Sequence, residues 1–294
     1  MSPPDRRDDV HGPASVVVAD EPGLSFELAL ATDVGSEREN NEDAFGFFVE
    51  SKASVVFAVA DGVGGYEGGE LASRMAIDGT LDSYRGSPAA FGPAKRLARA
   101  AQRANIAIYD RAVVVTELSR MATTLTAVAV EGGVLHAVHV GDCRLYLVRD
   151  GRITQLTKDH TVAAGRVRLG VLAKEKLRTH PERGTLTRSV GTELIVAVDR
   201  LATPLVQGDK VLVASDGLHG KLTDDELAEI VQRERAPVAC RALLDAANVR
   251  GTEDNLTAVV YTQTGEVAPA PAPGGAARLL ELLTAPFRRT TKPG

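Results

Sequence analysis

Runs of apolar and alternating residues indicate where the chain forms strands. They predict strands at 26–32, 54–60, 124–130, 134–140, 144–149, 194–199, 209–215 and 256–262. A periodicity near 3.6 residues predicts helices at 69–83, 93–113, 223–233 and 237–249. The strands come in groups joined by short turns, and the helices come in pairs. This order favours an α+β fold of largely antiparallel sheets covered by helix pairs.

Two short motifs add local detail to this pattern. Asp150-Gly151 separates two strand-like segments and is typical of a two-residue hairpin turn. Thr223 and Glu226 have the spacing of a capping box, which predicts the start of the third helix.

The predicted core block, 25–264, has polar or proline-rich segments on both sides. Residues 1–24 are polar and interrupted by prolines, so we expect a flexible leader. Residues 265–294 contain a Pro/Ala/Gly linker followed by a short basic amphipathic tail. The tail has the character either of a docking segment for a partner or acidic membrane surface, or of a frayed terminus.

Composition and charge narrow the class of protein. The chain has 34 Lys and Arg against 39 Asp and Glu, a net charge of −5, which argues against a general nucleic-acid binder. Two cysteines, Cys143 and Cys240, are too few for a disulfide framework and are typical of a reducing compartment. The sequence has no run of 18 apolar residues and no secretory signal pattern. We therefore expect a cytoplasmic protein without a transmembrane segment.

Acidic residues recur at the ends of predicted strands. Asp61, Asp142 and Asp216 each follow an apolar strand and stand beside a glycine, while Asp254 directly precedes the last strand. The cluster at 40–43 precedes a strand-like run at 44–48. Any single Asp-Gly is explained by a turn. Five such places can converge on one rim, where like charges require cations.

The candidate ligands indicate which cations would bind. They are carboxylates and backbone carbonyls, without a His/Cys cluster, so Mg²⁺ or Mn²⁺ fits better than zinc. Paired ions of this kind activate water and neutralise charge on a phosphoryl group. Arg38 lies four residues before Glu42, and its guanidinium matches phosphate oxygens. Beside an acidic metal site it is a candidate phosphate clamp, whereas alone it is an ordinary surface residue.

Seven segments, in order, resemble the metal-dependent serine/threonine protein phosphatases of type 2C, in their bacterial form. These segments are 32–43 (TDVGSERENNED), 59–73 (VADGVGGYEGGELAS), 121–127 (MATTLTA), 138–146 (VHVGDCRLY), 156–160 (LTKDH), 214–218 (ASDGL) and 252–257 (TEDNLT). They cover nearly the whole block 25–264. The resemblance implies an αββα sandwich with a metal site at one edge of the paired sheets.

The resemblance also implies roles for particular residues. Asp61 would bridge two core ions, with Arg38 gripping the substrate phosphate and Asp142 helping to hold a weaker third ion. The implied catalytic residues are Arg38, Asp43, Asp61 and Asp216. The implied metal-site residues are Glu42, Asp43, Asp61, Gly62, Asp142, Asp216 and Asp254. The implied reaction is direct attack of metal-bridged water on phosphoserine or phosphothreonine, without a phosphoenzyme.

Three features distinguish this chain within that resemblance. Tyr66 stands where bacterial members commonly have His, a residue that could assist protonation of the leaving alkoxide near neutral pH. Cys143 replaces a common Ser and is either an oxidation-sensitive thiol or buried filler. Residues 160–190, which match the variable flap beside the active site, carry seven Lys and Arg against two Glu. That excess either steers acidic phosphopeptides or forms a solvated face.

The sequence thus predicts a Mn²⁺- or Mg²⁺-dependent protein phosphatase. Its expected partners are phosphorylated proteins, including a cognate Ser/Thr kinase and its substrates. Two alternatives remain open at this stage. One is a pseudophosphatase that serves as a binding module, and the other is a dedicated phosphatase for one partner-switching regulator.

Overall fold

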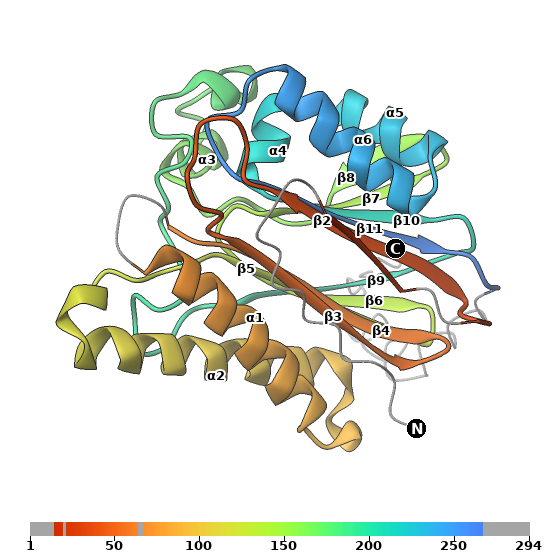
Figure 1. Cartoon of the computed structure of the whole chain (residues 1–294), viewed down its shortest axis with the longest axis horizontal. Helices are drawn as coiled ribbons and strands as arrows, with labels where there is room; N and C mark the ends of the chain where they lie inside the picture. The colour runs from red at the N-terminus through yellow and green to blue at the C-terminus, as the bar shows by residue number, and fades with distance from the viewer. Residues whose placement is uncertain (1–14, 20–21, 64–67, 267–294) are drawn as a thin grey trace, which may run out of the picture.

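Two antiparallel β-sheets lie face to face, and helices cover the outer face of each sheet (Figure 1). The computed structural model describes residues 15–19, 22–63 and 68–266. The layers follow the order α-β-β-α, which confirms the predicted sandwich of antiparallel sheets between helices.

The first sheet has the strand order β1-β2-β11-β10-β7-β8, and every neighbouring pair is antiparallel. Its strands are β1 (Ser15–Ala19), β2 (Phe26–Asp33), β7 (Arg144–Arg149), β8 (Arg152–Gln155), β10 (Lys210–Ala214) and β11 (Leu256–Gln263). The second sheet has the order β3-β4-β5-β6-β9, also antiparallel. Its strands are β3 (Asp43–Ser51), β4 (Ser54–Asp61), β5 (Leu125–Glu131), β6 (Val134–Val140) and β9 (Asp199–Pro204).

The helices divide between the two outer faces (Figure 1). The second sheet is covered by the long pair α1 (Gly69–Arg85) and α2 (Gly92–Val114), and the first sheet by a group around α6 (Ala236–Val249). The remaining helical segments are η1 (Ala89–Phe91), η2 (Thr116–Leu118), α3 (Val162–Arg168), η3 (Lys174–Thr179), α4 (Asp216–Lys221) and α5 (Asp224–Arg233). Among the described residues, no helix combines the length and apolar character needed to cross a membrane.

Strand β4 shows how the sequence produces this layering. Val55, Phe57 and Val59 pack between the two sheets, whereas Val56 and Ala58 pack against α1 and α2. Successive side chains of a strand point to opposite faces, and both faces of β4 are covered. A continuous apolar run, rather than an alternating one, is therefore required here.

Both local motifs form as predicted. The β7–β8 hairpin turns at Asp150-Gly151, where both residues have positive φ (50° and 73°). At the start of α5, Thr223 Oγ1 accepts a hydrogen bond from the Glu226 backbone N–H, and the Glu226 carboxylate accepts one from the Thr223 N–H.

Two expectations about chain segments were wrong. The strand predicted at 194–199 is instead an irregular segment, and β9 begins only at Asp199. The side-chain amide of Asn105, on α2, donates hydrogen bonds to the backbone carbonyls of Glu193 and Leu194. This apolar stretch therefore packs against α2 instead of pairing in a sheet. Residues 15–19, assigned to a flexible leader, form β1 and pair with β2. The rest of the leader, apart from 22–24, and the tail from 267 onward lie outside the described residues.

Candidate active site

The carboxylates predicted at strand ends meet at one edge of the paired sheets. Asp43 begins β3 and stands opposite Asp61, which ends β4, in the antiparallel register. Asp216 follows β10, and Asp254 precedes its neighbour β11. An antiparallel strand ends where its neighbour begins, so each pair of carboxylates reaches the same side. The pair Asp216 and Asp254 comes from the first sheet and the pair Asp43 and Asp61 from the second, and of these four residues Asp61, Asp216 and Asp254 line a common cavity.

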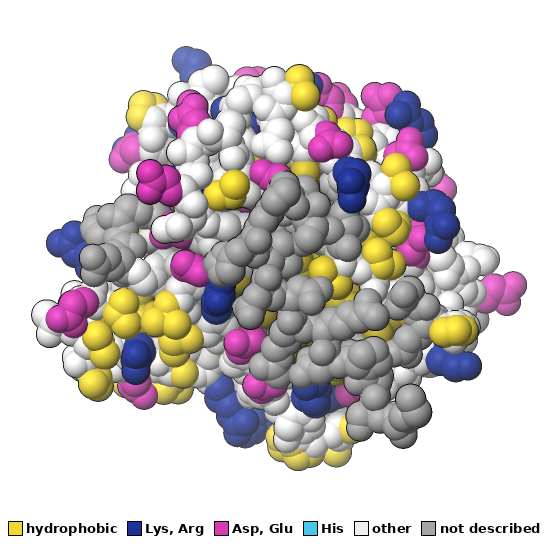
Figure 2. All heavy atoms as spheres, viewed as in Figure 1, with side chains coloured by type: hydrophobic (Ala, Val, Ile, Leu, Met, Phe, Trp, Pro, Cys, Tyr) yellow, Lys and Arg dark blue, Asp and Glu magenta, His cyan; other side chains and the backbone are white. Residues whose placement is uncertain are grey.

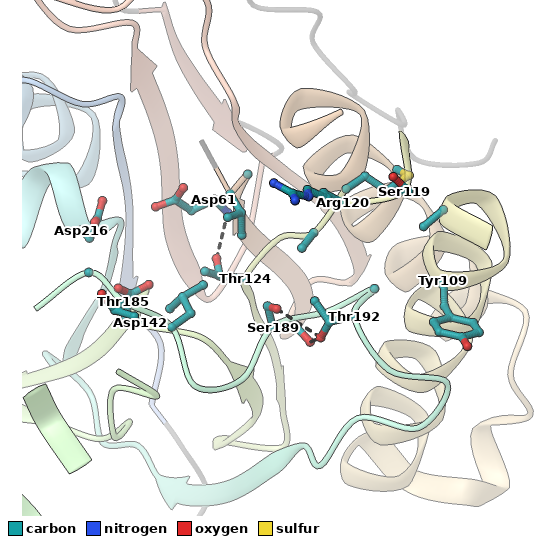
Figure 3. A pocket seen from close by; sticks show the side chains of 18 of the residues that line it. Asp61, Tyr109, Ser119, Arg120, Thr124, Asp142, Thr185, Ser189, Thr192 and Asp216 are labelled. Carbon is teal, nitrogen blue, oxygen red and sulfur yellow. Dashed lines mark hydrogen bonds between the residues drawn. The ribbon is translucent and has the colours of Figure 1, made fainter. Parts of the chain in front are cut away.

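A cavity of about 920 Å³ opens at this edge (Figure 3). Asp61, Asp142 and Asp216 lie together at one end of it (Figure 3). The predicted site residues that line the cavity are Arg38, Asp61, Gly62, Asp142, Asp216 and Asp254. Four of the five expected places, Asp61, Asp142, Asp216 and Asp254, thus meet at one cavity, whereas Glu42 and Asp43 do not line it.

Asp43 supports this rim from within the protein. It is buried, with 8% of its surface exposed, and it does not line the cavity. Thr257 Oγ1 donates a hydrogen bond to Asp43 Oδ2 at 2.7 Å, and Thr257 Oγ1 lies 2.8 Å from Thr32 Oγ1. Asp43 is thus fixed between the two sheets, directly behind the Asp61 position.

Glu42 is held at the point where β3, β4 and α1 meet. Its backbone N–H donates to Asn255 Oδ1 at 2.8 Å, and its carbonyl accepts from the Gly62 N–H at 3.0 Å. A Cβ added to Gly69 would lie 2.8 Å from Glu42 Oε1, so the carboxylate rests against the start of α1. A Cβ added to Gly62 would lie 2.5 Å from the Gly69 carbonyl oxygen, which explains why residue 62 is glycine.

Burial and mutual repulsion raise the pKa values of these carboxyl groups. Burial raises the pKa of Asp61 well above its ordinary value, and the charges of Asp43 and Asp216 raise it further. Burial raises the pKa of Asp43 to about 7 and that of Asp216 to about 6, with neighbouring carboxylates adding to both. Such a cluster holds several negative charges at neutral pH only when cations offset them.

Arg38 lies at the mouth of the site. Its Nη2 forms an ion pair with Asp254 Oδ1 at 3.0 Å, and its Nε donates to the Glu253 carbonyl at 3.0 Å. The guanidinium therefore lines the cavity beside one of the predicted metal ligands. The phosphate role expected for Arg38 from the sequence did not include this contact with Asp254.

The turn that carries Asp142 is fixed by two histidines. His219 Nε2 donates to the Asp142 carbonyl at 3.0 Å, and the Gly141 N–H donates to His160 Nδ1 at 3.0 Å. A Cβ at Gly141, where φ is +105°, would lie 2.5 Å from the Thr124 side chain. Close packing against Thr124 thus orients the Asp142 carboxylate toward the cavity.

Several supporting residues received no individual role in the sequence analysis, although most lie inside the matched segments. Thr124 Oγ1 accepts a hydrogen bond from the Asp61 N–H at 2.9 Å and fixes the end of β4. The Asn255 amide donates to the carbonyls of Val34 and Asn40 and so ties the Arg38 loop to β11. The only sequence signal for these residues was that they are polar and lie within a matched segment. Their hydrogen-bond partners lie far away in sequence, so their roles could not be predicted.

The donor set fits hard divalent cations. Its side chains offer oxygen atoms only, which suit Mg²⁺ or Mn²⁺. In the part of the chain that the structure describes, no three acidic, His or Cys side chains already form a closed ligand group.

Two distinctive positions of the sequence analysis have different outcomes. Cys143 is fully buried, with its Sγ 3.2 Å from Thr124 Oγ1, and burial raises the pKa of its thiol well above the ordinary value. It is buried filler and not an accessible thiolate. Tyr66 lies outside the described residues.

The basic flap, residues 160–190, is tied down by several of its arginines. Arg166 pairs with Glu182 at 2.6 Å, and Arg178 donates to the Leu222 carbonyl at 3.1 Å. Arg183 lines a second cavity of about 350 Å³, which shares Asp142 and Asp216 with the first. Much of the flap's charge is therefore engaged in local contacts.

The fold and the acidic cavity by themselves indicate a hydrolase-like site without assigning its family, and comparison with known proteins establishes the family. The profile of protein phosphatase 2C matches residues 35–258. The chain therefore belongs to the protein phosphatase 2C family, and it is a serine/threonine protein phosphatase of the bacterial type.

Individual relatives agree with this. The serine/threonine phosphatase stp of Listeria monocytogenes is 32% identical over 245 residues, covering 81% of this chain and 97% of that protein. PstP of Mycobacterium tuberculosis is 35% identical over 237 residues, covering 81% of this chain and 45% of that protein. A crystal structure of the PstP catalytic domain in complex with two manganese ions has a TM-score of 0.72 at 30% identity, covering 85% of this chain and 100% of that chain.

Proposed function

We propose that this protein hydrolyses phosphoserine and phosphothreonine in proteins by direct attack of water, with two Mn²⁺ or Mg²⁺ ions at the carboxylate edge. The observation that carries the proposal is the convergence of Asp61, Asp142, Asp216 and Asp254 on one cavity beside Arg38. Bound there, the ions would polarise a water molecule and offset charge on the phosphoryl oxygens.

The residues divide into those that face the ions and those that support them. Asp61, the Gly62 carbonyl, Asp216 and Asp254 would hold the two core ions. Glu42 and Asp43, which lie behind the cavity, would act on the second ion through water. Asp142, together with Asp216, would hold a weaker third ion.

Arg38 has a separate task in this proposal. Its guanidinium would bind and orient the substrate phosphate through paired N–H donors. In the described structure the same group pairs with Asp254. If Asp254 serves as a metal ligand, Arg38 would exchange this ion pair for the substrate phosphate.

The biological setting is also part of the proposal. The substrates would be phosphoproteins modified by a cognate Ser/Thr kinase, whose action this enzyme reverses. Both cysteines are free and buried, which supports a cytoplasmic location. The complete set of acids argues against a pseudophosphatase, and a single dedicated phosphoprotein substrate remains the alternative to a broad range.

Phosphate release from a phosphothreonine peptide tests the proposal. We expect release with Mn²⁺, loss of release with a chelator, and loss in Asp61→Asn. Asp150→Asn provides a matched control, because the same carboxyl-to-amide change then falls in the β7–β8 turn, where Asn accepts positive φ. Release that survives thorough chelation would overturn the proposal.

A further inference from the structure

The cavity at the carboxylate edge extends well beyond the acidic residues. Figure 3 shows it running from Asp216 at one end to Tyr109, on α2, at the other. The residues that line this second end, which we call the apolar arm, are Tyr109, Ala112, Val113, Met121, Ala122 and Gly191. The arm thus lies between the C-terminal end of α2 and the segment that precedes β5.

The two ends of the cavity differ in chemistry. At one end are the carboxylates of Asp61, Asp142 and Asp216, whereas the arm is lined mainly by aliphatic and aromatic side chains and a glycine, with Ser119 beside them. Between the two ends, Arg120 and the hydroxyls of Ser189 and Thr192 line the cavity (Figure 3). A single continuous space therefore offers sites for a phosphoryl group and for an apolar group.

The arm opens onto an exposed apolar surface. Val113 is 67% exposed and Val114 is 80% exposed, at the end of α2. Figure 2 shows apolar side chains gathered in this region, at the lower left of the molecule. Of the two valines, only Val113 lines the cavity. Within the part of the chain that the structure describes, an incoming chain could therefore reach the arm past Val113.

The size of the cavity exceeds what a phosphoryl group needs. At about 920 Å³ it lies near the upper end of the range of about 300–1,000 Å³ that accommodates drug-sized ligands. A phosphoserine or phosphothreonine side chain fills only the acidic end. The remaining volume is available to a neighbouring part of the same substrate.

We propose that the apolar arm binds a large apolar side chain of the phosphoprotein substrate, close in sequence to the phosphorylated residue. This inference rests on the proposed phosphatase function and adds a substrate preference to it. Continuity of the arm with the carboxylate site favours the substrate as the occupant, because a chain whose phosphate reaches Asp61 can extend along the same cavity.

The dimensions limit which substrate positions reach the arm. A sphere of 920 Å³ is about 12 Å across, and an extended chain advances about 3.3–3.6 Å per residue. The arm is therefore reached from positions two to four residues away from the phosphorylated residue. The preference should be absent for small aryl phosphates, which end at the acidic site.

The test compares phosphothreonine peptides in which a single Leu is moved along an otherwise Ser/Ala sequence, on both sides of the phosphothreonine. We expect kcat/KM to rise about tenfold for Leu at one position two to four residues away, because a hydrophobic pocket discriminates at about this level. A small aryl phosphate serves as the reference substrate.

A matched pair of variants locates the effect. Val113→Asp places a charge at the mouth of the arm and should abolish the Leu preference while leaving aryl phosphate hydrolysis unchanged. Val114→Asp makes the same change one residue further on, outside the cavity lining, and should keep the preference. Val113→Leu, which retains apolar character, should also keep it.

Other outcomes would overturn the inference in recognisable ways. Equal rates for all peptides in the wild type, with normal Mn²⁺-dependent release, would refute the arm and leave the phosphatase function intact. No peptide hydrolysis at all would refute the function itself. If residues 267–294 of this chain occupied the arm, Val113→Asp would accelerate every peptide alike. If a second copy occupied it, the variant would change the molecular mass in light scattering.

Discussion

The carboxylate edge and the basic flap are neighbours, yet they hold their charges in opposite ways. At the edge, Asp43 and Asp61 are fixed as cross-strand partners, so the β-ladder forces like charges together. In the flap, Arg166 pairs with Glu182, and Arg188 pairs with Asp199 at 2.7 Å. The edge is thus electrostatically unfavourable without cations, whereas much of the flap's charge is satisfied within the protein.

This difference indicates which of the two regions binds ligands. Charges that the fold forces together are available to bind something from outside, because binding relieves their repulsion. Charges that already have partners mainly hold a segment in place. Changes at the edge should therefore alter the chemistry, and changes in the flap should alter substrate access by smaller factors.

The largest effect is expected from removing one edge carboxylate. Asp61→Asn or Asp216→Asn should lower turnover by about a thousandfold or more, equivalent to roughly 4 kcal/mol in the barrier. With a chelator present, each variant should melt at a higher temperature than the wild type, because less negative charge is crowded together. Steady-state kinetics measures the loss of turnover, and thermal unfolding measures the change in melting temperature. Variants that retain a tenth of the activity would refute the assigned metal roles.

A smaller loss is expected at Arg38. Arg38→Ala should lower kcat/KM about a hundredfold, because it removes charged hydrogen bonds to phosphate, worth about 1.5–3 kcal/mol each. Metal affinity should stay equal or rise, since Arg38 otherwise competes for Asp254. Calorimetric Mn²⁺ titration alongside kinetics measures both quantities. Lost metal binding with unchanged kcat/KM would reverse the assignment.

The crowding of the edge carboxyl groups should make the free energy of unfolding depend on pH when no metal is bound. Burial raises the pKa of Asp61 and Asp142 well above the ordinary value, and that of Asp43 to about 7. The folded protein then keeps protons that the unfolded chain has released. The free energy of unfolding should therefore fall as pH rises toward 8, by roughly 1 kcal/mol per pH unit.

The useful range for this measurement lies between pH 6.5 and 8. At lower pH, buried His139 and His219, whose pKa values burial lowers to about 4 and about 3, oppose the trend. Denaturant unfolding with a chelator gives the slope. Mn²⁺ or Asp61→Asn should flatten it, and an unchanged slope in Asp61→Asn would contradict the proposed crowding.

The smallest effect is expected in the flap. Lys174 and Lys176 lie exposed on η3, unlike the paired Arg166. Replacing both lysines with Gln should reduce the preference for acidic over neutral phosphopeptides about twofold to threefold, and added salt should shrink that preference in the wild type. Rates with both peptides and an aryl phosphate measure this. Equal loss on all three substrates would show that the flap shapes the carboxylate edge instead.

The sequence by itself determined the positions of most strands and of the long helices, and it identified the acids that line the edge. Apolar runs such as 54–60 fix a buried strand, because only apolar side chains can face two covered layers. Asp61 and Asp216 were identifiable because each ends such a run beside a glycine. The strand predicted at 194–199 failed because apolar character alone does not distinguish packing on a helix from pairing in a sheet.

Only the tertiary structure decided how the site is supported and how far it extends. Thr257 and Asp43 are 214 residues apart, and Asn255 and Glu42 are 213 apart, yet each pair is joined by a hydrogen bond. The Arg38–Asp254 ion pair and the apolar arm beside Val113 likewise arise from segments distant in the chain. Such contacts depend on the register of both sheets and the placement of α2, which no local pattern of residues encodes.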